Sequence, residues 1–208
     1  MNSIDKLTEI FKSFPGIGSR QAKRFVYFLL SQNPVFIDDL SKLIADVKKD
    51  ISQCANCYRF FTKSVSSAKE NNLCAICANP QTDKSVLMVV EKDVDLENVN
   101  KTGAYKGLYF ILGGSLPILE QNPAKKIRAR ELFDRAQEYS KNGLKEVILA
   151  TSATPEGENT AQYVKKILAP LAEKYGVKIS ALGRGLSTGT ELEYSDASTL
   201  ENALKNRG

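Results

Sequence analysis

The sequence predicts an α/β fold with a mostly parallel sheet and flanking helices, placed after a helical segment and a four-cysteine segment. Buried strands alternate with helical stretches after residue 86, which indicates a parallel sheet. The four cysteines form two C-x2-C pairs ahead of these strands, and apolar residues at helical spacing precede the cysteines. We therefore expect four regions: a helical domain over 1–53, a cysteine region over 54–85, an α/β domain over 86–182 and a C-terminal segment over 183–208.

The composition is that of a folded protein without histidine chemistry. The 208 residues carry a net charge of +5, and 42 % of them are hydrophobic. The absence of histidine excludes Ser-His-Asp triads, Cys-His dyads and histidine-ligated metals, so proton transfer would fall to carboxylates, lysine or tyrosine. The longest apolar run, Val86–Val90, is far shorter than the ~20 residues of a membrane span. Because the N-terminus is amphipathic and carries acids, unlike a secretory signal, we expect a cytoplasmic protein that binds no membrane.

Apolar spacing predicts three helices in the first region. The first is expected over about residues 4–13, and a Pro-Gly-Ile-Gly sequence then breaks it. Ser19 opens the second helix, because serine is a favoured N-cap residue. We expect Pro34 to end this second helix. A third helix is expected from Leu40 to Ile51.

A glycine hairpin between the first two helices carries the first functional signal. Gly16 and Gly18 allow a tight turn and the close approach of a phosphate. The start of the following helix favours an anion, and Arg20, Lys23 and Arg24 gather on its polar face. Such a turn and helix start bind the phosphates of the nucleic-acid backbone and do not recognise the base sequence. We therefore predict a DNA contact here, with a plain glycine turn and a solvated basic face as the alternative.

The four cysteines predict a structural zinc finger with one Zn²⁺ per chain. Cys54-x2-Cys57 and Cys74-x2-Cys77 are sixteen residues apart, and this spacing suits four thiolates in a tetrahedron. The segment between the pairs is too polar to fold by itself, so the metal would supply the missing stability. Two disulfides in an exported protein are the alternative, but such bonds are rare in the cytosol. Because four thiolates leave no open position, we do not expect catalysis at this zinc.

Strands and helices alternate along the third region. The strands are expected at residues 86–90, 108–112, 146–150 and 177–182, and the helices at about 124–142 and 159–175. In the tail, a glycine-rich loop precedes a short helix that begins at Ser195 or Asp196. Because open α/β sheets place their sites at the carboxyl ends of strands, acids that follow a strand directly are candidate site residues.

Such acids follow two of the predicted strands. Glu91 comes directly after the first strand, and Glu156 and Glu158 follow the third. The stretch A-T-S-A-T-P-E-G-E resembles the A-T-D-x-D-R-E-G-E signature of Toprim domains, which occur in topoisomerases and DnaG-type primases. The resemblance implies that these three glutamates lie in a Toprim site. For Glu156 and Glu158 the alternative is a favourable interaction with the following helix start alone.

The Toprim resemblance lacks the pair of metal-binding aspartates. Ser152 and Thr154 stand where a magnesium-dependent Toprim enzyme carries aspartate, and Pro155 replaces the arginine. Magnesium prefers charged oxygen ligands, so two neutral hydroxyls weaken a two-metal site. The sequence therefore predicts a Toprim-like fold without Toprim catalysis.

The combined motifs resemble the bacterial recombination mediators of the RecR family over about residues 4–204. Members have a helix-hairpin-helix, a four-cysteine zinc finger, a Toprim domain and a tail similar to R-G-L…E-L-E-Y-x-D here. The resemblance implies a non-catalytic clamp for single-stranded and gapped double-stranded DNA, which assembles as a ring-shaped homotetramer through segments that include 183–208. It also implies that RecO, and in many bacteria RecF, are partners in loading RecA during DNA repair. It places DNA contacts on Arg20 and Arg24, and partner contacts on Glu91, Glu156 and Glu158.

The chain departs from the family pattern after Gly114. A Ser-Pro loop is replaced there by a segment that adds either to an electropositive surface or to a solvated helix face, and its cations are Lys125, Lys126, Arg128 and Arg130. The tail stretch 192–196 resembles a Walker B strand, yet no P-loop precedes it, so we expect no nucleotide hydrolysis.

Two other functions are compatible with the sequence. A Toprim-type metal-dependent nuclease or primase-like enzyme would use Glu91 together with another acid. A zinc-stapled scaffold that binds only protein partners would show no affinity for DNA when the partner is absent.

Overall fold

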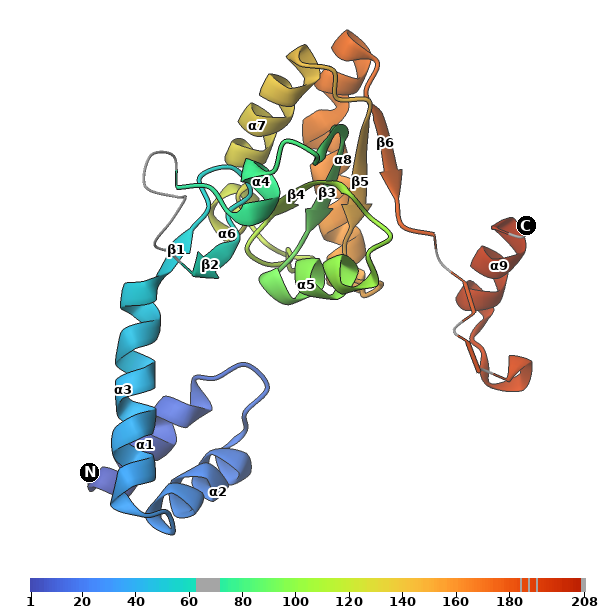
Figure 1. Ribbon diagram of the computed structural model, residues 1–208. Coiled ribbons are helices and arrows are strands. Elements are labelled where there is room, and N and C mark those ends of the chain that lie inside the picture. Colours follow the sequence, from blue (N-terminus) through green and yellow to red (C-terminus); the bar gives the residue numbers. More distant parts are fainter. Residues whose placement is uncertain (63–71, 184, 187, 190, 207–208) are drawn as a thin grey trace. The chain divides into compact units, whose positions relative to one another are not determined.

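The chain is divided into two units, which are described separately below: Met1–Ser52 and Gln53–Gly208 (Figure 1). The computed structural model describes residues 1–62, 72–183, 185–186, 188–189 and 191–206. The first unit is mainly helical, and the second contains a parallel sheet with helices around it. The predicted α/β fold class is confirmed.

Three helices form the first unit. They are α1 (Ser3–Lys12), α2 (Ser19–Leu30) and α3 (Pro34–Asp50). Phe11 of α1 makes edge-to-face contacts with Phe14 and Phe25, with ring centroids 5.6 and 5.7 Å apart. Ala22 and Val26 of α2 are buried, so the apolar face predicted for this helix is the face that packs.

Two helix boundaries in this unit differ from the prediction. Gly18, not Ser19, is the N-cap of α2, and Ser19 is its first helical residue. Pro34 begins α3, whereas the sequence predicted that it ends α2. The side chain of Asn33 accepts a hydrogen bond from the Phe36 N–H at 2.8 Å. Proline suits the next position because the first helical residue has no N–H to satisfy, so α3 starts earlier than its apolar spacing indicates.

A four-stranded parallel sheet forms the centre of the second unit. In spatial order its strands are β4 (Gly107–Ile111), β3 (Asp83–Val90), β5 (Glu146–Ala150) and β6 (Lys178–Ala181). Val90, the last residue of β3, pairs with both Ile111 and Ala150, so three strands end at one edge. This register places Glu91 directly beyond the carboxyl edge, as the sequence predicts.

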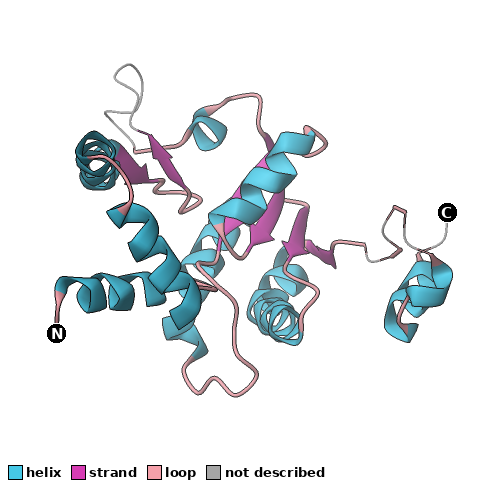
Figure 2. Cartoon of the chain, turned by 90° about the horizontal axis from the view of Figure 1, so that it is seen from below, coloured by secondary structure: helices cyan, strands magenta, loops and turns pink. Residues whose placement is uncertain are grey.

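Helices lie on both faces of this sheet (Figures 1 and 2). They are α5 (Asp93–Thr102), α7 (Ala129–Lys141) and α8 (Pro155–Tyr175). Leu87 and Val89 point into the core shared with α7 and α8, whereas Met88 and Val90 point into the core shared with α5. Because successive strand residues face opposite sides, β3 is apolar throughout its buried part.

Two helical predictions need correction, and one helix was not predicted. The helix expected over 124–142 is two helices, α6 (Pro123–Lys126) and α7, and Arg128 lies at the break. The Arg128 N–H donates to the Leu112 carbonyl at 2.9 Å, so tertiary contacts hold the chain out of helical geometry. α8 begins at Pro155 because Thr154 caps it, and not at 159. Helix α5 was not predicted, since its polar sequence has little apolar periodicity.

Shorter elements surround the cysteines and form the tail. They are β1 (Ile51–Gln53), β2 (Phe60–Thr62), α4 (Ala75–Ala78), the 3-10 turn Leu192–Tyr194 and α9 (Ala197–Lys205). β1 and β2 pair as a two-stranded sheet. The N-cap of α9 is Asp196, which agrees with the predicted helix start. Among the helices described here, none has the length and apolar character needed to cross a bilayer.

Candidate functional site

The four cysteine side chains converge on one point of the second unit. Their Sγ atoms lie within 4.8 Å of one another, and those of Cys57 and Cys74 are 3.6 Å apart. Four sulfurs bound tetrahedrally at about 2.3 Å from one zinc ion would be separated by about 3.8 Å. Cys54, Cys57 and Cys74 are buried, and Cys77 is half-buried. The set therefore fits a single metal ion.

Two turns direct these sulfurs toward each other. In the first, Tyr58 takes a positive φ of 62° and its N–H donates to the Cys54 carbonyl at 3.0 Å. In the second, Cys74 is the N-cap of α4, and the Ala78 N–H donates to its carbonyl at 2.9 Å. The Cys74 N–H also donates to Cys54 Sγ at 3.4 Å, a contact that favours the thiolate.

Contacts among the sulfurs make their ionisation unequal. The hydrogen bond from Cys57, followed by those from Cys74 and Cys77, lowers the pKa of Cys54. The bond to Cys54 is also the largest effect that raises the pKa of Cys57 and of Cys77. A divalent cation bound here would hold all four sulfurs as thiolates and would supply a structural cross-link.

The cysteine cluster is joined to the edge strand β4. The Ile111 N–H donates to the Cys57 carbonyl at 2.9 Å. The Tyr58 ring meets Phe110 edge-on at 5.3 Å, and the Arg128 guanidinium lies 5.1 Å from the Tyr58 ring centroid. The packing of Tyr58 between Phe110 and Arg128 was not predicted. The sequence feature that could have indicated it is an aromatic residue directly after the first cysteine pair.

The glycine hairpin of the first unit has an open backbone. Gly16 takes a left-handed φ of 77°, and no atom lies within 4 Å of the place where a Cβ would be. Gly18 caps α2 without a side-chain hydrogen bond, so no cap occupies the first amides of the helix. These amides are therefore available to an anion such as a phosphate oxygen.

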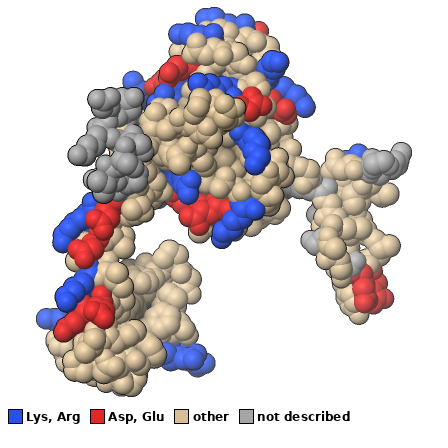
Figure 3. Space-filling model, viewed as in Figure 1, with Lys and Arg blue, Asp and Glu red and all other residues tan. Residues whose placement is uncertain are grey.

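The predicted DNA-contacting cations lie on the surface of α2. Arg20, Lys23 and Arg24 are exposed, and the Arg24 guanidinium donates to Gln21 Oε1 at 3.4 Å. On the face drawn in Figure 3, Lys and Arg are spread out and do not merge into one broad basic area. On α2 itself, positive charge is supplied by Arg20, Lys23 and Arg24.

Glu91 is the buried acid at the carboxyl edge of the sheet. It is 3 % exposed, and its Oε1 and Oε2 accept hydrogen bonds from the Ser152 N–H and hydroxyl, both at 3.0 Å. Ser152 stands at one of the positions where the Toprim signature has a metal-binding aspartate. The carboxylate is thus engaged by the chain itself, a contact that was not predicted from sequence.

The second aspartate position is used as a helix cap. The Thr154 hydroxyl accepts a hydrogen bond from the Gly157 N–H at 3.1 Å and so begins α8. A Cβ on Gly157 would overlap the carbonyl oxygen of Ser152, which explains a glycine between two glutamates. Glu156 and Glu158 lie exposed in the first turn of α8, where the helix dipole favours acids. Glu91 is therefore set apart from them by its burial.

The four cations of the segment after Gly114 do not all face solvent. Lys125, Lys126 and Arg130 are exposed. Arg128 is half-buried, and its guanidinium donates to the Ile111 carbonyl at 3.0 Å. One of the four cations thus holds the sheet edge instead of facing solvent.

Comparisons with known proteins cover nearly the whole chain. Residues 85–183 match the family model of the Toprim domain, and residues 185–207 match the model described as RecR, C-terminal. The chain is 34 % identical over 204 residues to the Recombination protein RecR of Lactobacillus acidophilus, covering 98 % of this chain and 96 % of the relative. It is 35 % identical over 205 residues to the protein of the same name from Chlorobium chlorochromatii (99 % and 96 % covered) and 38 % identical over 204 residues to that of Roseiflexus sp. strain RS-1 (98 % and 92 % covered).

Proposed function

This chain belongs to the RecR family of recombination proteins, and we propose that it is a non-catalytic DNA-binding clamp of recombinational repair. In this proposal it helps RecO, and RecF where that protein is present, to load RecA at single-stranded gaps in the cytoplasm. Similarity over nearly the full length to relatives named recombination proteins supports the role in recombination. The structural features below support the remaining parts.

The glycine hairpin supports DNA binding. Gly16 and Gly18 leave the backbone open beside the start of α2, and Arg20, Lys23 and Arg24 add positive charge on the same helix. Helix amides and arginines hold phosphates without regard to base sequence. A clamp that must bind any gap requires this kind of contact.

The engaged carboxylate of Glu91 is the observation that carries the non-catalytic part of the proposal. A Toprim-type reaction needs several carboxylates that hold divalent cations. Here both oxygens of Glu91 accept hydrogen bonds from Ser152, and Thr154 caps α8. Ser152 and Thr154, at the two aspartate positions of the signature, thus stabilise the fold. This favours a protein that binds DNA over an enzyme that acts on it.

The cysteine cluster is proposed to hold one structural Zn²⁺. Four thiolates without a histidine or carboxylate suit zinc in a closed site. The two turns that carry the cysteines contain little other core, so the metal would hold them together.

Assembly and partner binding are proposed for two surfaces. The first unit exposes apolar side chains that a second copy could cover in a ring-shaped homotetramer: Ile10, Phe14, Phe28, Leu30, Val35, Leu43, Ile44 and Val47. We assign RecO to the Toprim surface, where Glu156 and Glu158 are exposed beside the buried Glu91.

A combined binding and activity assay tests the proposal. Purified protein, with and without RecO, is incubated with end-labelled gapped DNA, nucleotides and Mg²⁺ over a salt titration. We expect salt-sensitive binding and unchanged DNA. Metal-dependent cleavage or synthesis that Glu91→Gln abolishes would establish the enzyme alternative, and absence of DNA binding in both conditions would favour a scaffold for proteins alone.

A further inference from the structure

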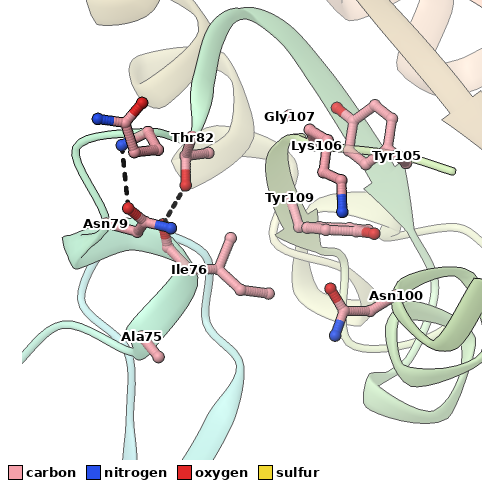
Figure 4. Close-up of a pocket in the computed structure, with 10 residues that line it drawn as sticks. Ala75, Ile76, Asn79, Thr82, Asn100, Tyr105, Lys106, Gly107 and Tyr109 are labelled. Atoms are coloured by element: carbon pink, nitrogen blue, oxygen red, sulfur yellow. Dashed lines mark hydrogen bonds between the residues drawn. The ribbon is translucent and has the colours of Figure 1, made fainter. Parts of the chain in front are cut away.

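A pocket of about 350 Å³ lies next to the cysteine cluster in the second unit (Figure 4). Its walls come from α4 and the turn that follows it, the end of α5 and the start of β4. Ile76 and Asn79 lie on one side, and Asn100, Lys106 and Tyr109 lie on the other (Figure 4). The functions proposed above use none of these residues.

The hydroxyl of Tyr109 is buried without a hydrogen-bond partner among the described residues. Tyr109 is 3 % exposed, and burial raises the pKa of its hydroxyl, which therefore stays a donor. The neighbouring Tyr105, whose ring meets Tyr109 edge-on at 5.0 Å, donates its own hydroxyl to the Leu108 carbonyl at 2.8 Å. Buried polar groups are normally paired, so the hydroxyl of Tyr109 suggests a partner from outside the chain.

The pocket is rich in hydrogen-bond donors and has no acidic residue in its lining. Lys106 supplies an ammonium group, and Asn100 supplies a carboxamide. Asn79 Oδ1 already accepts the Gln81 N–H at 2.9 Å, which leaves the amide NH₂ of Asn79 as a donor. Such a lining favours a ligand with negatively charged acceptor oxygens, as in a phosphate.

The size and the apolar wall favour a ligand larger than phosphate alone. Pockets from about 300 Å³ upward hold small organic molecules. Tyr105, Tyr109 and Ile76 provide an aromatic and aliphatic wall, on which a nucleobase can pack. Carboxamides such as that of Asn100 match the donor and acceptor pattern of a base edge. A nucleotide combines a base with a phosphate and so fits both parts of the lining.

We propose that this pocket binds one nucleotide unit, with its base against the tyrosines and its phosphate near Lys106. The unit belongs either to a free mononucleotide or to single-stranded DNA, because both present the same base and phosphate. The site is separate from the glycine hairpin, and the inference does not depend on DNA binding by that hairpin.

Photo-crosslinking of the full chain tests the inference. The probes are 5-iodo-dUMP and a single-stranded oligonucleotide with one 5-iodo-deoxyuridine, and crosslinked peptides are mapped by mass spectrometry. We expect crosslinks at Tyr105 or Tyr109. Crosslinking by the mononucleotide identifies a free nucleotide as a ligand, and crosslinking by the oligonucleotide alone identifies DNA. If neither probe crosslinks at these tyrosines, the inference is wrong.

Three variants separate binding from structure. Lys106→Ala and Tyr109→Phe should each reduce crosslinking at least tenfold, whereas Lys101→Ala, an exposed lysine outside the pocket lining, should not. Tyr109→Phe should keep or raise the Tm because it removes a buried hydroxyl that has no partner among the residues that the structure describes. A lower Tm with unchanged crosslinking would show a structural role and overturn the inference. Arg20→Ala with Arg24→Ala should weaken gapped-DNA binding while 5-iodo-dUMP crosslinking persists, so the two proposals can fail independently.

Discussion

Ser152 donates two hydrogen bonds to Glu91, one from its N–H and one from its hydroxyl, and each is 3.0 Å long. A carboxylate as buried as Glu91 is unfavourable unless its oxygens are satisfied. Ser152 stands where a Toprim enzyme has a metal-binding aspartate. Instead of binding a metal together with Glu91, it stabilises the Glu91 carboxylate by hydrogen bonds. Serine in place of aspartate at position 152 removes a negative charge from the sheet edge. It also gives Glu91 a hydrogen-bond donor as its partner.

The hydroxyl of Ser152 should contribute measurably to stability. Ser152→Ala is expected to lower the free energy of unfolding by about 1–3 kcal/mol, because a buried carboxylate loses a donor. Urea unfolding followed by circular dichroism measures this change. In the Glu91→Gln background the same substitution should have a smaller effect, since the charged acceptor is gone. Equal losses in both backgrounds would contradict the coupling.

Gly157 should tolerate no side chain. Gly157→Ala places a Cβ against the Ser152 carbonyl and should lower the free energy of unfolding by about 3 kcal/mol, since backbone must move. Gly183→Ala is the matched control, because no atom lies within 4 Å of its added Cβ. Thermal unfolding of both variants is compared. Similar Tm values for the two glycine variants would contradict this prediction, because they would show that α8 moves to accommodate the Cβ at little cost.

The cysteine cluster should bind one zinc ion that the fold requires. Cys77→Ser is expected to reduce the zinc content from about one ion per chain and to lower the Tm, because three sulfurs leave the site incomplete. Elemental analysis and thermal unfolding measure the two effects. Asn56→Ala, within the first cysteine turn, should retain the metal. Full zinc content in Cys77→Ser would remove this residue from the site.

Arg20 and Arg24 should contact phosphates. Replacing both with alanine should weaken binding to gapped DNA and reduce the slope of log K against log salt by about 2, since each contact releases about one counterion. Lys42→Ala with Lys48→Ala makes the same charge change on the exposed surface of α3. Fluorescence anisotropy over a salt series compares the two double variants. Identical slopes would move the DNA contact away from α2.

The features that could be predicted from the sequence are those that neighbouring residues in the chain determine. The C-terminal part of β3, residues 86–90, is one continuous apolar run, and the spacing of the four cysteines defines a metal site without further context. Glu91 could be placed at the sheet edge because it follows β3 directly. The start of α9 was also predicted, at Ser195 or Asp196, and Asp196 is its N-cap.

Features that depend on distant contacts were not predicted. The break at Arg128 is stabilised by the carbonyls of Ile111, the last residue of β4, and Leu112, which follows it. The bond between Ser152 and Glu91 joins residues far apart in sequence, so no local pattern signals it. The pocket beside Tyr109 is formed by α4, α5 and β4 together, and the lack of a hydrogen-bond partner for its hydroxyl among the described residues depends on that packing.

The bond from Ile111 to the Cys57 carbonyl has a consequence for solubility. β4 is an outermost strand of the sheet, and an uncovered outer strand can pair with strands of other molecules. The first cysteine turn, which the proposed zinc ion would hold in place, covers part of that strand by accepting one of its N–H groups. Stripping the ion with a chelator should therefore promote aggregation before the helices melt.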